Sequence, residues 1–389
     1  MRLWKRAAGA LKDRNSIWLA SISRRTPYRN PDLEALVIKA TSHDESYVDY
    51  KNAQRVFQWV RTSAIYLKPL IRALSMRMEK TRSWVVALKG LMLMHGVFHC
   101  KTPAVQMIGR LPFDLSNFSD GHSKMGKTWG YDVFIRAYFL FLDQKSALLG
   151  SEMKLQKGRI WLTEEPFTEE LTRLQKWQSL LDVLLQIKPR TEDMIVTLVL
   201  EAMDCVVVEI FEVYSRICSG IAQALLQVYE VGGKDEAEMA LVVLQKARVQ
   251  SEELAMFFEF CRDIGVINAS EFPNVEQIPD EDFRDLEQII NGEFKGKSLD
   301  GNGMPPEDMR AIVLKESGAI VEQRESKSVL KTIITEKWEV FEEDLKVNGA
   351  GNSSGIRSIT AREDPYTTPL TGFPLVLASN QVVPDLISF

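Results

Sequence analysis

The stretch "EDMIVTLVLEAMDCVVVEIFEVYSRICSGIAQALLQVYE", from Glu192 to Glu230, sets the architecture of this chain. Its apolar residues lie on several sides of a helix and not along one stripe, which is typical of a helix covered by other elements. A second run, "SWVVALKGLMLMHGVFH" from Ser83, places one set of residues on a single helical face: Val85, Leu88, Leu91, Met92 and His95. The two runs predict a central buried helix among amphipathic ones.

Helical periodicity continues on both sides of these runs, from about residue 32 to 292. Breaks separate the helical runs at Thr26-Pro27, Lys101-Thr102-Pro103, Lys188-Pro189-Arg190, Gly232-Gly233 and Phe272-Pro273. We therefore expect an all-α chain, a superhelical stack of antiparallel helices. We expect a basic amphipathic segment over 1–29, the helical domain over 30–292, and a disordered tail over 293–389, where turn-rich sequence replaces the helical period.

The chain of 389 residues has a formal net charge of −5, but the charge is unevenly distributed. Residues 1–90 carry 18 Lys and Arg against 7 Asp and Glu, a net +11, which leaves −16 for the remainder. Such asymmetry indicates that the basic end faces an anionic partner, either nucleic acid or a lipid headgroup. No signal-peptide pattern or 18-residue apolar run is found, and the four widely spaced cysteines are expected to be free thiols in a reducing, cytoplasmic compartment.

Local signatures of catalysis or metal binding are absent from the sequence. "GEFKGKS" from Gly292 ends like a phosphate-binding loop but has Asn291 where the first glycine is needed. "DGNGMP" from Asp300 begins like a calcium loop and then lacks the later ligands. The four histidines form no HExxH or similar spacing, and His95 is expected in the core. We predict no enzyme activity, no cofactor and no metal.

The N-terminal fifteen residues have the composition of a helix that lies on a membrane surface. Leu3, Trp4 and Leu11 share one helical face, while the basic side chains of Lys5, Arg6 and Lys12 spread over the other sides. The alternative is a frayed basic extension of the first core helix. Arginines at this end also suit a nucleic-acid backbone, but no recognition-helix or RNA-stacking motif accompanies them, so no nucleic acid is expected.

Four motifs resemble one known family: "LVIKATSHDE" from Leu36, "KGLMLMHGVF" from Lys89, "LSNFSDGHS" from Leu115 and "YDVFIRAYFLFLDQK" from Tyr131. In this order and spacing they resemble the ANTH domain of clathrin assembly proteins, the plant branch in particular. The resemblance covers about residues 30–290 and is most family-specific over about 26–160.

The resemblance implies a helical head that binds phosphatidylinositol 4,5-bisphosphate, and a tail that recruits clathrin heavy chain and heterotetrameric clathrin adaptors. Such proteins promote clathrin coat assembly and vesicle budding in endocytosis, and some sort vesicle SNAREs. Peripheral attachment at clathrin-coated pits, coated vesicles and the Golgi or trans-Golgi network follows as an expectation. The alternative from another class is a basic-faced helical scaffold that binds RNA or acidic proteins without coat proteins.

The family's lipid site is a lysine followed ten residues later by a Lys-x-Lys-His cluster. Lys39 matches the first lysine, but Asp49 and Asn52 replace the second lysine and the histidine, and only Lys51 fits. Arg55, one helical turn after Lys51, is able to restore a charge. We predict a remodelled headgroup site at Lys39, Lys51 and Arg55, with Asp49 either opposing phosphate or capping a helix start. The alternative is that these are solvated charges at helix ends.

Two short motifs in the tail also resemble those of the family. "WEVFEED" matches a WxxF-acidic adaptor-binding motif through Trp338, Phe341, Glu342 and Glu343, unless the amphipathic segment "SVLKTIITEKWEVFEEDL" buries both aromatic rings. "PDLISF" resembles a clathrin box through a second set of residues, Asp385, Leu386, Ile387 and Phe389. The α-carboxylate of Phe389 stands where the box has its acid.

Overall fold

The computed structural model describes residues 2–121, 129–158, 167–231, 233–271 and 278–292. Their α-helices are α1 (Arg2–Ser21), α2 (Pro31–Ala40), α3 (Tyr50–Thr62), α4 (Leu67–Lys80), α5 (Trp84–Phe98), α6 (Pro103–Gln106), α7 (Trp129–Gly158), α8 (Phe167–Leu184), α9 (Thr197–Val231), α10 (Lys234–Asp263) and α11 (Asp280–Ile290). Short 3-10 helices are η1 (Ala64–Tyr66), η2 (Glu192–Met194) and η3 (Ile267–Glu271). The predicted all-α fold is confirmed, and the expected disordered tail lies outside the described residues.

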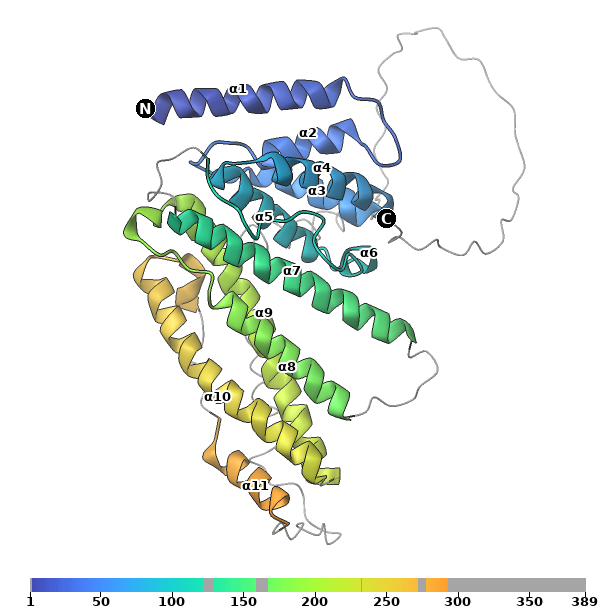
Figure 1. Cartoon of the computed structure of the whole chain (residues 1–389), viewed down its shortest axis with the longest axis vertical. Helices are drawn as coiled ribbons and strands as arrows, with labels where there is room; N and C mark the ends of the chain where they lie inside the picture. Colours follow the sequence, from blue (N-terminus) through green and yellow to red (C-terminus); the bar gives the residue numbers. More distant parts are fainter. Residues whose placement is uncertain (1, 122–128, 159–166, 232, 272–277, 293–389) are drawn as a thin grey trace, which may run out of the picture. The chain divides into compact units, whose positions relative to one another are not determined.

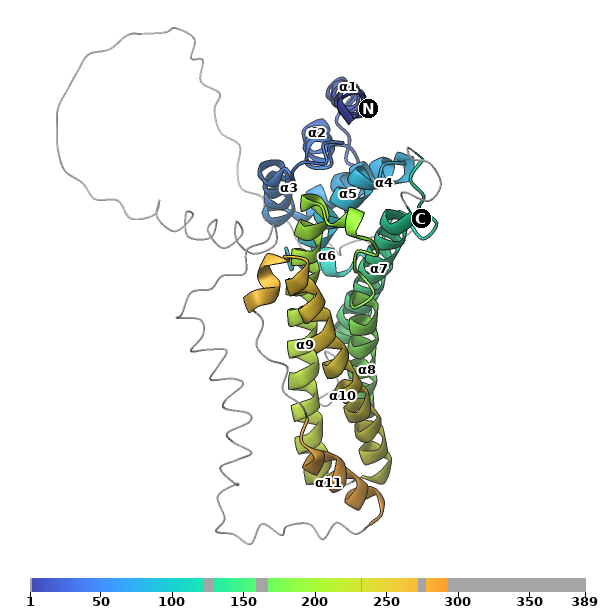
Figure 2. The ribbon, with the colours of Figure 1, turned by 90° about the vertical axis from the view of Figure 1, so that its left-hand side faces the viewer.

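Helices that follow one another in the chain pack side by side (Figure 1). Helix α1 packs on α2, which contacts α3 and α4, while α7 packs on α8, α8 on α9 and α10, and α10 on α11. Figure 2 shows the long helices α8, α9 and α10 next to one another from a second direction. The predicted superhelical stack of antiparallel helices is confirmed.

Helix α5 is covered on every side, although its sequence pattern predicts one apolar face. Each residue from Val85 to Phe98 is buried, because α2, α3, α4, α6, α7 and α9 all contact this helix. Two glycines of α5 let side chains of α4 and α3 approach its backbone closely. A Cβ at Gly90 would lie 2.1 Å from the sulfur of Met78, and a Cβ at Gly96 would lie 2.3 Å from Cζ of Phe57. Helix α5 is thus a central element of the N-terminal helices.

Helix α9 is the central helix that its sequence predicts. Residues from Leu198 to Ile210 are almost all buried between α5, α8 and α10. The Tyr50 hydroxyl at the start of α3 donates a 2.6 Å hydrogen bond to the Glu201 carboxylate of α9, which joins helices 151 residues apart. Within the described residues all four cysteines are free, and Cys205 is fully buried, as expected of structural thiols.

The ends of α2 and α3 fix the segment between them. Helix α2 begins after Asn30, whose side chain accepts hydrogen bonds from two backbone N–H groups of the first turn, and Pro31 occupies the first helical position. Helix α2 ends at Ala40 and is capped by Thr41, whose hydroxyl donates to the Val37 carbonyl at 2.7 Å. The next helix begins after Asp49. Residues 41–49 therefore form a short connection between two capped helices.

Candidate functional site

The three cationic residues of the predicted headgroup site lie on α2 and α3, which pack on each other. Lys39 is in the last turn of α2, and Lys51 and Arg55 lie one turn apart on α3. All three are exposed, and within the described part of the chain none of their side chains has a hydrogen-bond or ion-pair partner. Their positive charge is therefore available to an anion from solution. We call these three residues the cationic cluster.

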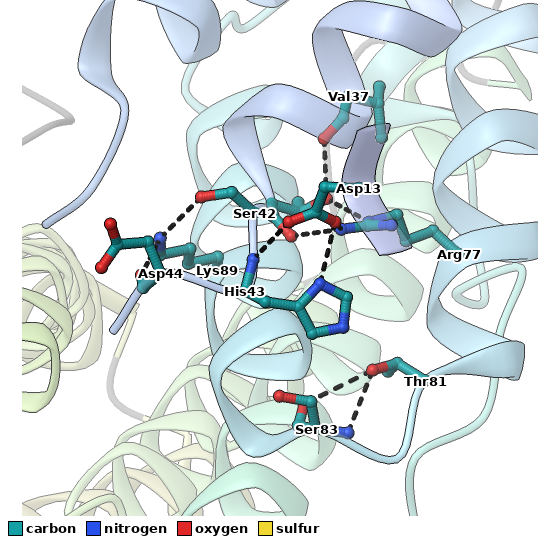
Figure 3. A network of polar contacts seen from close by, with 10 residues as sticks. Asp13, Val37, Ser42, His43, Asp44, Arg77, Thr81, Ser83 and Lys89 are labelled. Carbon is teal, nitrogen blue, oxygen red and sulfur yellow. Dashed lines mark hydrogen bonds and ion pairs between the residues drawn. The ribbon is translucent and has the colours of Figure 1, made fainter. Parts of the chain in front are cut away.

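The connection from α2 to α3 is held in place by α1 and α4 (Figure 3). Arg77 of α4 donates to the hydroxyl and the carbonyl of Thr41, both at 2.7 Å. Asp13 of α1 accepts from the backbone N–H of His43 at 2.8 Å and contacts its Nδ1 at 2.8 Å. Arg77 also donates to Asp13 at 2.7 Å. Burial alone would raise the pKa of Asp13, but the hydrogen bonds from His43 and Arg77 outweigh it and lower the pKa.

Lys89 of α5 fixes the same connection from the core side. Its ammonium donates to Oγ of Ser42 at 3.2 Å and to the carbonyl of Asp44 at 2.5 Å. It also lies 5.4 Å from the centre of the Tyr47 ring. Burial lowers the pKa of Lys89 to about 8, against the opposing effect of nearby carboxylates led by Asp44. We call residues 41–44 the clamped turn, because three helices hold it.

Asp49 caps the start of α3. Its carboxylate accepts from the backbone N–H of Asn52 at 3.1 Å and from the Asn52 side-chain amide at 2.6 Å. The two residues that replace the family's lysine and histidine are thus bonded to each other. Of the two alternatives for Asp49, the helix cap is confirmed.

Helix α1 presents an apolar outward face. Leu11 is 66% exposed and Trp18 is 60% exposed, and Ile22, just beyond the helix end, is 61% exposed. Lys12 and Arg14 are also exposed. The backbone of Leu3, Trp4, Lys5 and Arg6 is helical, but their side chains lie outside the described part. Whereas the sequence predicts a surface helix over fifteen residues, α1 continues to Ser21, and Ala20 in its last turn is fully buried.

A second polar group is buried between α5, α7 and α9. Oε2 of Glu209 contacts Nε2 of His95 at 2.9 Å and Nε2 of His99 at 3.1 Å, and accepts from the Lys145 ammonium at 2.5 Å. The Tyr138 hydroxyl lies 2.8 Å from Nδ1 of His95. Burial lowers the pKa of His95 to about 4. Burial would raise the pKa of Glu209, but Lys145 and the histidines hold it well below its usual range. His95 is the satisfied core histidine that the sequence predicts.

The histidine spacing was misjudged from the sequence. His95 lies in the last turn of α5 and His99 caps the end of that helix four residues later, so their side chains share a face, and the fold adds Glu209 beside them. Their ligand atoms lie within 4.8 Å of one another, close enough to hold a metal ion. The Lys145 ammonium already compensates Glu209 at 2.5 Å, however, and a metal ion would have to displace it. This arrangement favours a charge-balanced core cluster.

A cavity of about 290 Å³ lies between α7, α8 and α9. Its charged groups pair with one another: Arg216 lies 3.7 Å from Glu152 and 4.3 Å from the centre of the Trp177 ring, and Trp177 donates to Glu152 at 2.9 Å. Because these charged groups already pair with one another, the described part of this cavity shows no sign of a ligand site.

The predicted adaptor residues (Trp338, Phe341, Glu342, Glu343) and clathrin residues (Asp385, Leu386, Ile387, Phe389) lie outside the described residues.

Sequence reasoning missed the side chains that hold the clamped turn. The sequence pattern assigns no contact to Lys89, Asp13 or Arg77. One signal was present, because a lysine inside the apolar run of α5 must find partners when buried. No comparable signal marks Asp13, which lies among exposed basic residues of α1.

Among the described helices, none is both long enough and apolar enough to cross a membrane.

The ANTH domain family model matches residues 32–292. Three Arabidopsis thaliana proteins are similar to this chain. "Putative clathrin assembly protein At1g25240" is 47% identical over the full length of both chains. "Putative clathrin assembly protein At1g68110" is 46% identical over 89% of each chain, and "Putative clathrin assembly protein At1g14686" is 44% identical over 75% of this chain and 82% of its own.

Proposed function

Because this chain belongs to the ANTH-domain family, we propose that it works as a clathrin adaptor on a membrane surface. Its head, residues 30–292, binds phosphoinositide-containing membrane, and its tail, residues 293–389, recruits clathrin heavy chain and heterotetrameric adaptors. The complex promotes coat assembly and vesicle budding at the cytoplasmic side of coated pits and vesicles, including those of the Golgi. Vesicle SNAREs are the proposed cargo. The chain itself catalyses no reaction.

The observation that carries the membrane role is the cationic cluster on either side of the clamped turn. Lys39, Lys51 and Arg55 are exposed and have no partner among the described residues, while the connection between them is fixed. A site with a fixed backbone and free cations is suited to a multiply charged headgroup, since little ordering is left to occur on binding. The exposed side chains of Leu11 and Trp18 on α1 are suited to apolar contact with the same membrane.

The test is vesicle co-sedimentation of the full chain with Lys39, Lys51 and Arg55 all changed to Glu. Each cation near an anionic leaflet contributes about 1 kcal/mol, and each Glu adds repulsion. The triple variant should therefore bind phosphatidylinositol 4,5-bisphosphate vesicles at least about 100-fold more weakly. The loss should shrink at high salt, because the Debye length falls below about 10 Å above 0.1 M.

A matched control reverses three exposed cations elsewhere, Lys154, Lys176 and Arg262, on α7, α8 and α10. It has the same net charge as the test variant and should retain binding. If the test and control variants lose vesicle binding equally, net charge alone explains the loss, and a local headgroup site is contradicted. Filter binding to RNA, run beside the vesicles, tests the scaffold alternative: tighter binding to RNA than to vesicles would favour it.

The proposed tail contacts need a separate test. In the full chain, Trp338→Ala with Phe341→Ala should reduce capture of the heterotetrameric adaptor from cytosol, because two aromatic anchors are lost. Leu386→Ala with Ile387→Ala should reduce capture of clathrin heavy chain and leave adaptor capture unchanged. Undiminished capture in both double variants would overturn the motif assignments without affecting the head.

A further inference from the structure

Helix α1 meets the other helices through a narrow inner face. Gly9, Asp13 and Ala20 are buried, and their spacing places them on one side of the helix. Leu11 and Trp18, on the outward side, are exposed. Asp13 is therefore the single ionised residue that the described part of α1 buries, at 8% exposure.

The contacts of Asp13 lead directly to the clamped turn. Its carboxylate binds the backbone N–H and Nδ1 of His43, both at 2.8 Å, and shares Arg77 with Thr41. Figure 3 shows this carboxylate between the His43 ring and the Arg77 guanidinium. The clamped turn is part of the connection between α2, which carries Lys39, and α3, which carries Lys51. The position of α1 is thus coupled, through hydrogen bonds, to the connection between the two helices that carry the cationic cluster.

We propose that Asp13 is a positioning residue for membrane binding: it docks α1 on the clamped turn, so that the outward face of α1 and the cationic cluster act as one binding surface. The membrane partner rests on the proposed function, whereas the docking of α1 can be measured without lipid. Two weak contacts that are held together bind more tightly than either alone, because the second contact forms at high effective concentration. Undocking α1 reduces this gain, because residues 22–30 alone then hold α1 near the cationic cluster and its orientation is no longer fixed.

Gly9 offers a test of docking in which two effects have opposite signs. Inside a helix, intrinsic propensity favours alanine over glycine, so Gly9→Ala would stabilise an undocked α1. In the docked helix, a Cβ at Gly9 would lie 2.6 Å from Cβ of His43, which belongs to the clamped turn. Gly9→Ala therefore loosens α1 if the helix is docked, and tightens it if the helix is free.

The first measurement is amide hydrogen exchange of the lipid-free full chain. Asp13→Asn should accelerate exchange along α1 by about tenfold, because charged hydrogen bonds are lost. Gly9→Ala should also accelerate it, because its Cβ overlaps His43, whereas Glu45→Gln, at an exposed carboxylate of the same region, should not. Gly9→Ala also provides the answer if Asp13→Asn fails to fold. Unchanged or slower exchange in α1 of Gly9→Ala would overturn the docking.

The second measurement is binding to phosphatidylinositol 4,5-bisphosphate vesicles. Asp13→Asn should weaken binding about tenfold or more, and should have no further effect in a chain that already carries Leu11→Ser and Trp18→Ser. An additive loss in that background would assign Asp13 a general structural role and overturn the positioning role. A wild-type chain that does not bind these vesicles would overturn the proposed function, and the membrane role of Asp13 with it, while the exchange result would still report the docking.

Discussion

Lys89 brings an ammonium group into the apolar helix α5, where it is 2% exposed. Its folded pKa, about 8, lies below the ordinary lysine value of 10.5 because burial disfavours the charge. Between these two pH values the unfolded chain holds a proton that the folded chain has released. The contribution of Lys89 to the free energy of unfolding therefore rises with pH across that window, because the folded protein favours the neutral amine over the ammonium.

We predict that the free energy of unfolding of the wild type, relative to Lys89→Met, increases by on the order of 3 kcal/mol between pH 8 and pH 10.5. Denaturant unfolding of both chains at a series of pH values measures this difference. Lys80→Met, at an exposed lysine of α4, is the control and should give a curve parallel to the wild type. A parallel curve for Lys89→Met would contradict the lowered pKa.

At this scale the sequence predicts exposed charges better than buried ones. Lys39, Lys51 and Arg55 were located from motif spacing along a short segment, and the structure exposes all three. The partners of Asp13 are 30 and 64 residues away, at His43 and Arg77. No local pattern distinguishes such a carboxylate from a solvated one, since only the packing of α1 and α4 brings the groups together.

Single helices show a related limit. The sequence pattern of α5 predicts a single apolar face, and three polar residues, Lys89, His95 and the following His99, interrupt or end its apolar run. Each of these polar side chains is paired inside the protein, so the helix is buried all round. The glycines of α5 did not predict this close packing either, because a glycine inside a helical pattern can have several structural roles.

Gly96 tests the packing of this helix. Gly96→Ala should lower the free energy of unfolding by about 1 to 3 kcal/mol, because the added methyl group overlaps the Phe57 ring. Gly220→Ala in α9 is the control: its Cβ would lie 2.9 Å from Cδ1 of Leu174, the end of a flexible side chain that can move aside. Chemical denaturation measures both, and equal stabilities of the two variants would contradict the tight α3–α5 contact.

On the scale of the whole molecule, the buried cluster around Glu209 joins helices from distant parts of the chain. Glu209→Gln should cost about 3 to 5 kcal/mol of stability, since Lys145 is left buried without a counter-charge. Glu212→Gln, one turn away at a carboxylate that is 42% exposed, should change stability little. Adding Lys145→Met to Glu209→Gln should recover part of the loss in the same denaturation measurement. No recovery would contradict the charge-balanced cluster.

The overall architecture was predictable because helical periodicity and break residues repeat over most of the chain. The order of the helices and the central place of α9 follow from those patterns. The cluster of His95, His99 and Glu209 was not predictable, because α9 reaches α5 only in the folded stack. Motif-based contacts of the tail concern residues outside the described part, and they stay predictions.

The burial of α5 by helices from both directions of the chain has a consequence during protein synthesis. His95 and its partner Glu209 are separated by 114 residues. At ribosomal speed the later helix follows the earlier one by roughly ten seconds. During that interval α5 is apolar all round, while the sides that α6, α7 and finally α9 cover in the folded protein are exposed until each of these helices is made. We therefore expect chaperones at the ribosome to bind the growing N-terminal half until α9 emerges and covers α5.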